Sequence, residues 1–393
     1  MKKKVLLVTT VPYSSAARLA GAFSALGATV EAVFPREAPI AVSRYLDRAY
    51  RYRPLASEES LADALRTAEP DFVIPCDDRA AALLAGLTAF APRLERCLGP
   101  LAAYRVLMAR APSMAVAREE GVVAPLTRAV DSLAALPEAL HEVGLPCVMK
   151  ADFSWGGAGV KFVCSADEAR RAFVKLQGPP SRLRSLVRVV KRRDLHFLDA
   201  ARNPVKATVN LQAFVPGKPA TSVFAAEDGK VLAAQHMDVV TWQGDAGPAT
   251  VMARVSDPVM DDAVAKIAAR FRLSGLHGLD FVRDAAGLPH LIEINPRATQ
   301  ICHLPLDADL PAALLGVPGR LPVTDRKQIA LFPQLLTADA LPPHIFRDIP
   351  WDDPRVLRFQ SGEALPEAAE LEAIAEFDRP VRRFGYRPPA GNR

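Results

Sequence analysis

The chain has 393 residues, which is more than one ordinary hydrophobic core supports, so its length predicts two or three domains. Half of its residues are hydrophobic, yet no run reaches the roughly 20 apolar residues of a membrane span, and we expect no membrane partner. The net charge of +5 is spread along the chain, which argues against nucleic-acid binding, and the five scattered cysteines favour reduced thiols in a cytoplasmic protein.

The first hundred residues have the pattern of a parallel, doubly wound α/β sheet. The apolar runs predict strands at 5–8, 29–34 and 71–75 and helices at 15–26 and 58–67. The turn after the first strand, at 9–14, contains no glycine, so we reject a dinucleotide-binding dehydrogenase. Asp77 and Asp78 follow the last of these strands, at the edge where such sheets bind ligands. We interpret Asp78 as a helix N-cap, and a substrate contact through Asp77 or Arg79 is the alternative.

The next hundred residues predict helices followed by a small lobe around a glycine loop. The expected elements are two short helices at 101–120 that Pro112 separates, helices at 131–142 and 166–176, and strands at 146–151 and 160–164. The loop between those strands carries Gly156, Gly157 and Gly159, whose backbone N–H groups can close over phosphates because no Cβ is in the way. Lys150, at the end of the strand before this loop, is the cation placed to meet the phosphates. The alternative is a plain glycine-rich hairpin with an exposed lysine.

A basic stretch at 182–193 and an antiparallel sheet follow. We interpret the basic stretch as a solvated helix face or loop, and cations that approach an anionic substrate are the alternative. The predicted sheet has strands at 208–215, 222–226, 231–240 and 250–255 and is followed by a helix at 257–272. His236 lies on one of these strands; we interpret it as a structural residue, with a substrate or phosphate contact as the alternative.

Two strands at 278–282 and 291–295 form a predicted acidic hairpin. With the turn centred near Ala286, Asp280 lies opposite Glu293 on the same face, with Cβ atoms roughly 5 Å apart. Asn295 shares that face because side chains alternate with a period of two. Two carboxylates that converge are repulsive unless a cation lies between them. The hard oxygens of these three residues suit Mg²⁺, and Mn²⁺ is a further candidate.

The region after the hairpin is less informative. His303, Asp307 and Asp309 come shortly after it, and we expect them to border an acceptor pocket. Residues 321–393 contain proline-rich stretches and predict a short appended segment that wraps the core.

Taken together, these motifs resemble the ATP-grasp superfamily, of the carboxylate-amine ligase and biotin carboxylase type. The resemblance covers residues 5–309 and depends chiefly on the string Glu-Ile-Asn-Pro-Arg at 293–297 with an acidic residue thirteen positions upstream. It implies an α/β and α+β multidomain protein in which a Rossmann-like pre-ATP-grasp domain precedes a two-lobed ATP-grasp fold with a small lid and a larger antiparallel-sheet domain. The implied parts are the pre-ATP-grasp domain at 1–100, linker helices and lid at 101–213, the sheet with the metal site at 214–320 and a C-terminal extension at 321–393.

The resemblance also implies roles for single residues. Lys150 would bind the phosphates of ATP, and Gly156, Gly157 and Gly159 would cover them. The backbone of residues 212–215 would read the adenine edge, with Phe214 and Val215 near the base and Gln212 at the start of this hinge. The implied metal ligands are Asp280, Glu293 and Asn295. Arg297 would stabilise the transferring phosphoryl group or the acyl phosphate.

Three positions depart from the family pattern. Many members have Asp-Lys where this chain has Ala109 and Arg110; because arginine can also bind phosphate, Arg110 is a candidate ligand of the nucleotide. The acid of the hinge is replaced by Ala213. The ribose-binding acid expected beyond it coincides with Lys218 or Pro219, so the ribose contacts stay unassigned.

The expected function is therefore an ATP- and Mg²⁺-dependent ligase that activates a carboxylate as an acyl phosphate for attack by an amine, with release of ADP and phosphate. Small-molecule carboxylate and amine substrates are the expected partners, and a homodimer is compatible with this class. Two alternatives stay open. One is a bicarbonate-activating enzyme of the carboxylase type, and the other is a non-catalytic module that binds nucleotide.

Overall fold

Three sheets make up the chain in the computed structural model, which describes residues 2–152, 159–177, 208–244, 247–338 and 341–361. The N-terminal sheet has the order β3-β2-β1-β4 and is parallel throughout, as predicted. Its elements are β1 (Lys4–Val8), α1 (Ser15–Ala25), β2 (Thr29–Phe34), β3 (Arg48–Arg51), α2 (Ser57–Ala68), β4 (Phe72–Pro75), α3 (Asp78–Gly86) and α4 (Ala91–Leu98). Strand β3 was not predicted, because it is a four-residue edge strand whose residues are mostly exposed and lack an apolar run.

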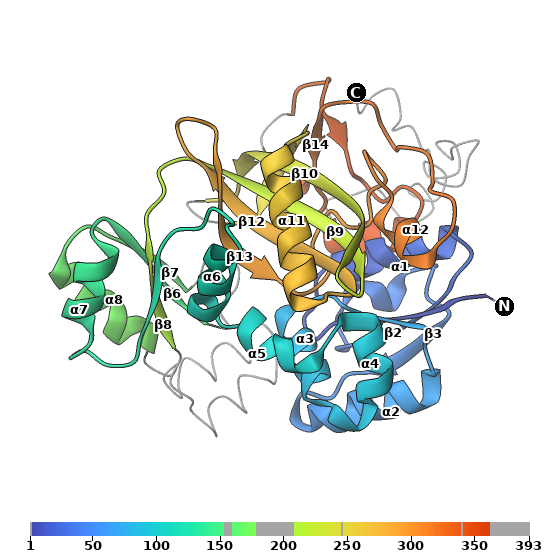
Figure 1. Cartoon of the computed structure of the whole chain (residues 1–393). Helices are drawn as coiled ribbons and strands as arrows, with labels where there is room; N and C mark the ends of the chain where they lie inside the picture. The colour runs from blue at the N-terminus through green and yellow to red at the C-terminus, as the bar shows by residue number, and fades with distance from the viewer. Residues whose placement is uncertain (1, 153–158, 178–207, 245–246, 339–340, 362–393) are drawn as a thin grey trace.

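The lid is a smaller lobe with a separate core. Its four-stranded sheet has the order β5-β8-β6-β7, and α7 and α8 pack against it as a lobe apart from the rest of the chain (Figure 1). The linker and lid elements are α5 (Tyr104–Leu107), α6 (Arg110–Glu119), β5 (Thr127–Val130), α7 (Leu136–Val143), β6 (Cys147–Ala151), β7 (Val160–Val163), α8 (Ala166–Gln177) and β8 (Val209–Ala213).

One expected boundary in the linker is wrong. The break between α5 and α6 falls at Met108 and Ala109, and Pro112 lies inside the first turn of α6. Proline is tolerated there because the N–H groups of a first helical turn have no partner within the helix. The end of α6 agrees with the prediction, since Gly121 follows it with a φ of +73°.

The large sheet is the centre of the molecule and has the order β13-β12-β9-β10-β11-β14-β15. Its elements are β9 (Lys218–Glu227), β10 (Lys230–Trp242), β11 (Ala249–Val255), α11 (Pro258–Phe271), β12 (Gly275–Arg283), β13 (Pro289–Asn295), α12 (Leu310–Leu315), β14 (Gln328–Ala330), β15 (Phe346–Arg347) and α13 (Pro354–Ser361). The segment that begins at residue 321 does more than wrap the core, because β14 pairs with β11 and extends the sheet.

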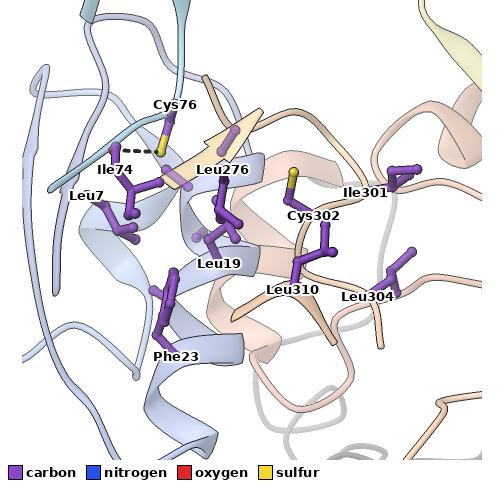
Figure 2. Packing of buried hydrophobic residues seen from close by; sticks show 14 of the residues in the cluster. Leu7, Leu19, Phe23, Ile74, Cys76, Leu276, Ile301, Cys302, Leu304 and Leu310 are labelled. Atoms are coloured by element: carbon purple, nitrogen blue, oxygen red, sulfur yellow. Dashed lines mark hydrogen bonds between the residues drawn. The ribbon is translucent and has the colours of Figure 1, made fainter. Parts of the chain in front are cut away.

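The two faces of this sheet belong to different cores. Helix α11 covers one face (Figure 1), where Phe224 packs with Ile267. The other face packs against the N-terminal domain, so that Leu276 of β12 shares one cluster with Leu7 of β1 and with Cys302 (Figure 2). This shared core fixes the N-terminal domain relative to the acidic hairpin. No helix in the described part of the chain is long and apolar enough to cross a membrane.

Candidate active site

The acidic hairpin forms as the sequence predicts. Asp280 of β12 lies directly opposite Glu293 of β13, and Gly278 lies opposite Asn295. Asn295 Nδ2 and Thr221 Oγ1 each donate a hydrogen bond of 2.9 Å to the carboxylate of Asp280. Burial raises the pKa of Asp280, and the charge of Glu293 raises it further. The hairpin therefore holds two carboxylates beside each other at an electrostatic cost that a cation would relieve.

This donor set consists of two carboxylates and one amide. Among the described residues there is no group of three or more His, Cys, Asp or Glu side chains that could hold a metal ion. A cation here would thus depend on the amide oxygen of Asn295 as well as on the two acids. Gly278 lets the loop after β13 close on the hairpin, since a Cβ at this position would lie 2.7 Å from Thr299 Cγ2.

Lys150 projects from β6 of the lid toward this hairpin. Its Nζ donates to Gln212 Oε1 at 2.9 Å, and the residue is 7% exposed, so the alternative of a solvent-exposed lysine is wrong. Burial lowers the pKa of Lys150, while the nearby charges of Glu293 and Asp280 oppose this effect. A buried ammonium beside carboxylates has the electrostatics of a group that binds anions.

Arg110 reaches the same place from the first residue of α6. Its Nη2 donates to Glu293 Oε1 at 2.8 Å and its Nη1 donates to the carbonyl oxygen of Ala151 at 2.8 Å. Asp152 lies 3.4 Å from Nη1 and also accepts a hydrogen bond of 2.9 Å from Asn210 Nδ2. The structure therefore brings Arg110, Lys150 and the hairpin together. Neither Asp152 nor Asn210 was a sequence candidate, although both lie within two residues of predicted ones.

Gln212 lies within a sheet and not in an unpaired hinge segment. It lies in β8, between β5 and β6, so its backbone is paired within the lid sheet. Its side chain instead joins Lys150, Thr127 Oγ1 at 3.0 Å and the carbonyl oxygen of Ile292 at 3.3 Å. The strand ends at Ala213, so within the expected hinge only Phe214 and Val215 lie outside the ladder.

An aromatic pair lies on the face of the lid that carries Lys150. The register places Val148 opposite Phe162, and Val148 is two residues from Lys150, so Phe162 shares the face of Lys150. Phe162 and Phe214 meet edge to face with ring centroids 4.7 Å apart, and they are 54% and 38% exposed. Phe162 was not a sequence candidate, although the period of two across the predicted hairpin places it on this face.

Arg297 connects the hairpin to the N-terminal domain. Its Nε donates to Asp78 Oδ1 at 2.8 Å and its Nη2 donates to Asn295 Oδ1 at 2.9 Å. The adjacent Ala298 N–H donates to the carbonyl oxygen of Pro75, at the carboxyl end of β4. The carboxyl edge of the N-terminal sheet and the end of β13 thus meet at this arginine.

The N-cap of α3 corrects one assignment. Asp77, rather than Asp78, caps the helix by accepting from the N–H of Ala80 at 2.9 Å. Asp77 also accepts from Thr10 N–H and Thr10 Oγ1 at 2.6 and 2.7 Å, which ties the turn after β1 to α3. With Asp77 engaged in this way, Asp78 is the acid that is left to face the site.

Other predicted neighbours have structural partners. His236 lies on the face opposite to Asp280, because it pairs with Ser222 while Asp280 pairs with the preceding Thr221; it bonds to Ser222 Oγ and to Asp261. His236 is therefore the structural residue that the sequence indicated, and it does not face the hairpin carboxylates. His303 bonds to Asp348, Asp307 pairs with Arg254, and Asp309 caps α12 and binds Arg320.

Part of the predicted loop lies outside the described residues. Gly156, Gly157 and the basic stretch at 182–193 fall there, whereas Gly159 closes the hairpin by accepting from the N–H of Ala151 at 3.1 Å. A hollow opens beside the site. Its lining residues are Asp78, Leu107, Met108, Arg110, Ser113, Glu293, Ile294 and Pro296.

Comparison with known families agrees with this geometry. Residues 184–300 match the family model of the ATP-grasp domain. Over these residues the chain is similar to ATP-grasp domains. The match spans the acidic hairpin, and it confirms the resemblance that the sequence motifs indicated. A search of curated proteins finds no match to this chain.

Solved structures show the same fold over most of the chain. The biotin carboxylase domain of 2-oxoglutarate carboxylase from Hydrogenobacter thermophilus is 17% identical, with a TM-score of 0.58 over 82% of this chain and 71% of that one. Carboxyaminoimidazole ribonucleotide synthase from Aspergillus clavatus is 17% identical, with a TM-score of 0.60 over 81% and 78%. L-amino acid ligase from Bacillus licheniformis is 14% identical, with a TM-score of 0.53 over 80% and 73%. The predicted fold class is confirmed.

Proposed function

We propose that this chain is an ATP- and Mg²⁺-dependent ligase that activates a small-molecule carboxylate as an acyl phosphate for attack by an amine, releasing ADP and phosphate. The observation that carries the proposal is the convergence of Lys150 from the lid and Arg110 from the linker on the carboxylates of the hairpin. Phosphoryl transfer needs charge neutralisation and alignment more than covalent help from the protein. Fixed cations that face a pair of acids meet that need.

The donor set of the hairpin fits Mg²⁺. Asp280, Glu293 and the amide oxygen of Asn295 are hard-oxygen ligands, and the raised pKa of Asp280, from burial and from Glu293, indicates a site that favours an added positive charge. When bound, Mg²⁺ or Mn²⁺ would neutralise charge on the phosphates of the nucleotide. The related domain from Hydrogenobacter thermophilus was solved with MgADP, and the synthase from Aspergillus clavatus with ATP, which supports both cofactors.

The lid supplies the groups that would hold the nucleotide. Lys150, which Gln212 orients, would bind the phosphates together with Arg110, and Gly156, Gly157 and Gly159 would cover them. Phe162 joins the expected Phe214 and Val215 at the part of the hinge outside the ladder, where two half-exposed rings offer an apolar surface to the base.

Arg297 would act on the transferring group. Asp78 and Asn295 hold its guanidinium at the junction of the hairpin and the N-terminal domain, where open α/β sheets bind ligands. Held in this way, it can stabilise the negative charge of a phosphoryl group or an acyl phosphate without reorganising. The hollow beside Asp78 and Glu293 is the proposed acceptor pocket.

The test is ADP release with a panel of carboxylate and amine pairs, bicarbonate included. We expect Glu293→Gln to lower turnover by about 100-fold or more, since it removes a charged ligand of the metal. Glu227→Gln, the same change at an exposed position at the end of β9, is the matched control and should keep activity. Turnover that survives Glu293→Gln would contradict the metal assignment, and AMP as the product would contradict the acyl phosphate. Release with bicarbonate alone would favour the carboxylase alternative.

Calorimetry separates the enzyme from a non-catalytic module. The resemblance implies acids at Ala213 and at Lys218 or Pro219, and this chain has none there, so a binding protein without turnover is the competing function. We expect a slow ATP analogue to bind far more weakly when Mg²⁺ is withheld. Binding that ignores Mg²⁺, with no ADP release from any pair, would favour the module.

We also propose a cytoplasmic location and a homodimer. All five cysteines lie among the described residues and are free thiols, which supports a cytoplasmic enzyme. The Hydrogenobacter thermophilus domain was solved as a dimer, and we propose that this chain forms a homodimer as well.

A further inference from the structure

One guanidinium joins three separate parts of the chain. Arg110 belongs to the linker helix α6, Ala151 and Asp152 end the lid strand β6, and Glu293 belongs to the sheet strand β13. The side chain of Arg110 is 11% exposed, and its two terminal nitrogens have different partners: Nη2 binds Glu293, and Nη1 binds Ala151 and approaches Asp152. The Glu293 contact is made to a proposed metal ligand.

Charge explains why Arg110 lies there. Glu293 and Asp280 lie directly opposite each other on the same face of the hairpin, and two carboxylates at this separation repel each other. Arg297 bonds to Asn295 and Asp78, whereas the ion pair of Glu293 is with Arg110. Arg110 thus supplies part of the positive charge that the carboxylate pair requires.

A divalent cation at the same carboxylates would compete with this guanidinium. The cation and the guanidinium would both interact with Glu293 Oε1, and their positive charges would repel each other at short range. By linkage, the factor by which Arg110 weakens cation binding equals the factor by which the cation weakens the pair of Arg110 and Glu293.

We propose that Arg110 is an exchangeable counter-ion: it holds Glu293 when no metal is bound, and it releases Glu293 when a divalent cation binds to the hairpin. The proposal rests on the proposed function and deepens it. Because Nη1 is held by Ala151 and Asp152, the released guanidinium stays at the end of the lid strand, next to Lys150. Metal binding thereby sets free a cation for the phosphates of the nucleotide. Arg110 is in this sense a positioning residue for the metal ligand Glu293 as well as a phosphate ligand.

The experiment titrates the full chain with Mn²⁺ alone, without nucleotide, and follows binding by electron paramagnetic resonance. Arg110→Met should raise the Mn²⁺ affinity roughly five- to tenfold, the size expected for losing one partly buried competing ion pair. In Arg110→Lys a single ammonium replaces the two nitrogens that bridge Glu293 and Ala151. It should compete less strongly than arginine but more than methionine, and so give a smaller rise in affinity. Arg105→Met removes an equal charge from an exposed position of α5 and should leave the affinity unchanged.

Three results would overturn the exchange. The first is an unchanged or lower Mn²⁺ affinity in Arg110→Met that still melts cooperatively, or in Arg110→Lys if the methionine variant does not fold. The second is a gain that persists when Glu293→Gln is added, since the competition should vanish with the shared oxygen. The third is the absence of Mn²⁺ binding in wild type and variants alike. ADP release is measured separately, so an intact ligase without exchange and an exchange without ligase activity are distinguishable.

Discussion

At the scale of single residues, the buried ammonium of Lys150 lowers the stability of the lid. Burying an ammonium costs free energy, and the lowered pKa of Lys150 reports that cost, with burial as the largest cause. Its hydrogen bond to Gln212 offsets only part of the cost, because a neutral amide is a weaker partner than a carboxylate. This cost is consistent with the proposed role of Lys150 as a ligand of the phosphates.

Replacing Lys150 by methionine should therefore separate stability from binding. We expect Lys150→Met to lower the affinity for an ATP analogue with Mg²⁺ by roughly 10- to 100-fold, the worth of a charge-assisted hydrogen bond, while the melting temperature stays the same or rises. Lys161→Met, which changes an exposed lysine on the opposite face of the same hairpin, is the control that should bind normally. A Lys150→Met protein with wild-type affinity in calorimetry would show that this lysine has no contact with the nucleotide.

At the scale of elements, the alternation of side chains decides which residues reach the site. Asp280 and Thr221 face the hairpin carboxylates, whereas Ser222 and His236, one position along, face α11. The same rule places Phe162 with Lys150 on one face of the lid. A shift of register by one residue in either sheet would exchange these faces completely.

The junction between α3 and β13 gives a second prediction. Asp78→Asn keeps the shape of the side chain but removes the charge that holds Arg297 Nε. Because Arg297 would then lose its charged partner, we expect the turnover number for ADP release to fall roughly tenfold, with a loss of stability of about 1 kcal/mol for this partly exposed pair. Asp63→Asn, in an exposed ion pair of α2, is the control. A change in KM without a change in kcat would argue that Asp78 contacts substrate instead of orienting Arg297.

The sequence predicts local features well because they depend on neighbouring residues. The pairing of Asp280 with Glu293 follows from one short turn and a period of two, and it is confirmed. The partners of Arg110 could not be predicted, since Glu293 is 183 residues away and no periodicity relates the two. The choice between Asp77 and Asp78 as N-cap likewise depended on Thr10, which only the folded sheet brings near. Edge strands such as β3 and β15 are too short to carry a pattern.

At the scale of the whole molecule, the C-terminal segment connects α1 of the N-terminal domain with the loop that follows β13. Asp348, which follows β15, lies between Arg18 of α1 and His303, and His303 belongs to the loop that follows Arg297. Burial alone would raise the pKa of Asp348, but the charges of Arg18 and His303 outweigh it and hold the pKa well below its usual range. Burial also lowers the pKa of His303.

Acid stability should consequently depend on Asp348. A depressed pKa contributes stability that is present above the unfolded value, about 3.9 for an aspartate, and is lost as the pH falls further. We expect Asp348→Asn to destabilise the chain by about 3 kcal/mol at pH 7, because it leaves Arg18 buried without its main partner, and to flatten the fall in stability below about pH 4. Urea unfolding from pH 3 to 7 measures both effects, with the exposed Asp325→Asn as control. If the variant lost stability in parallel with wild type below pH 4, another carboxylate would have to carry the acid dependence.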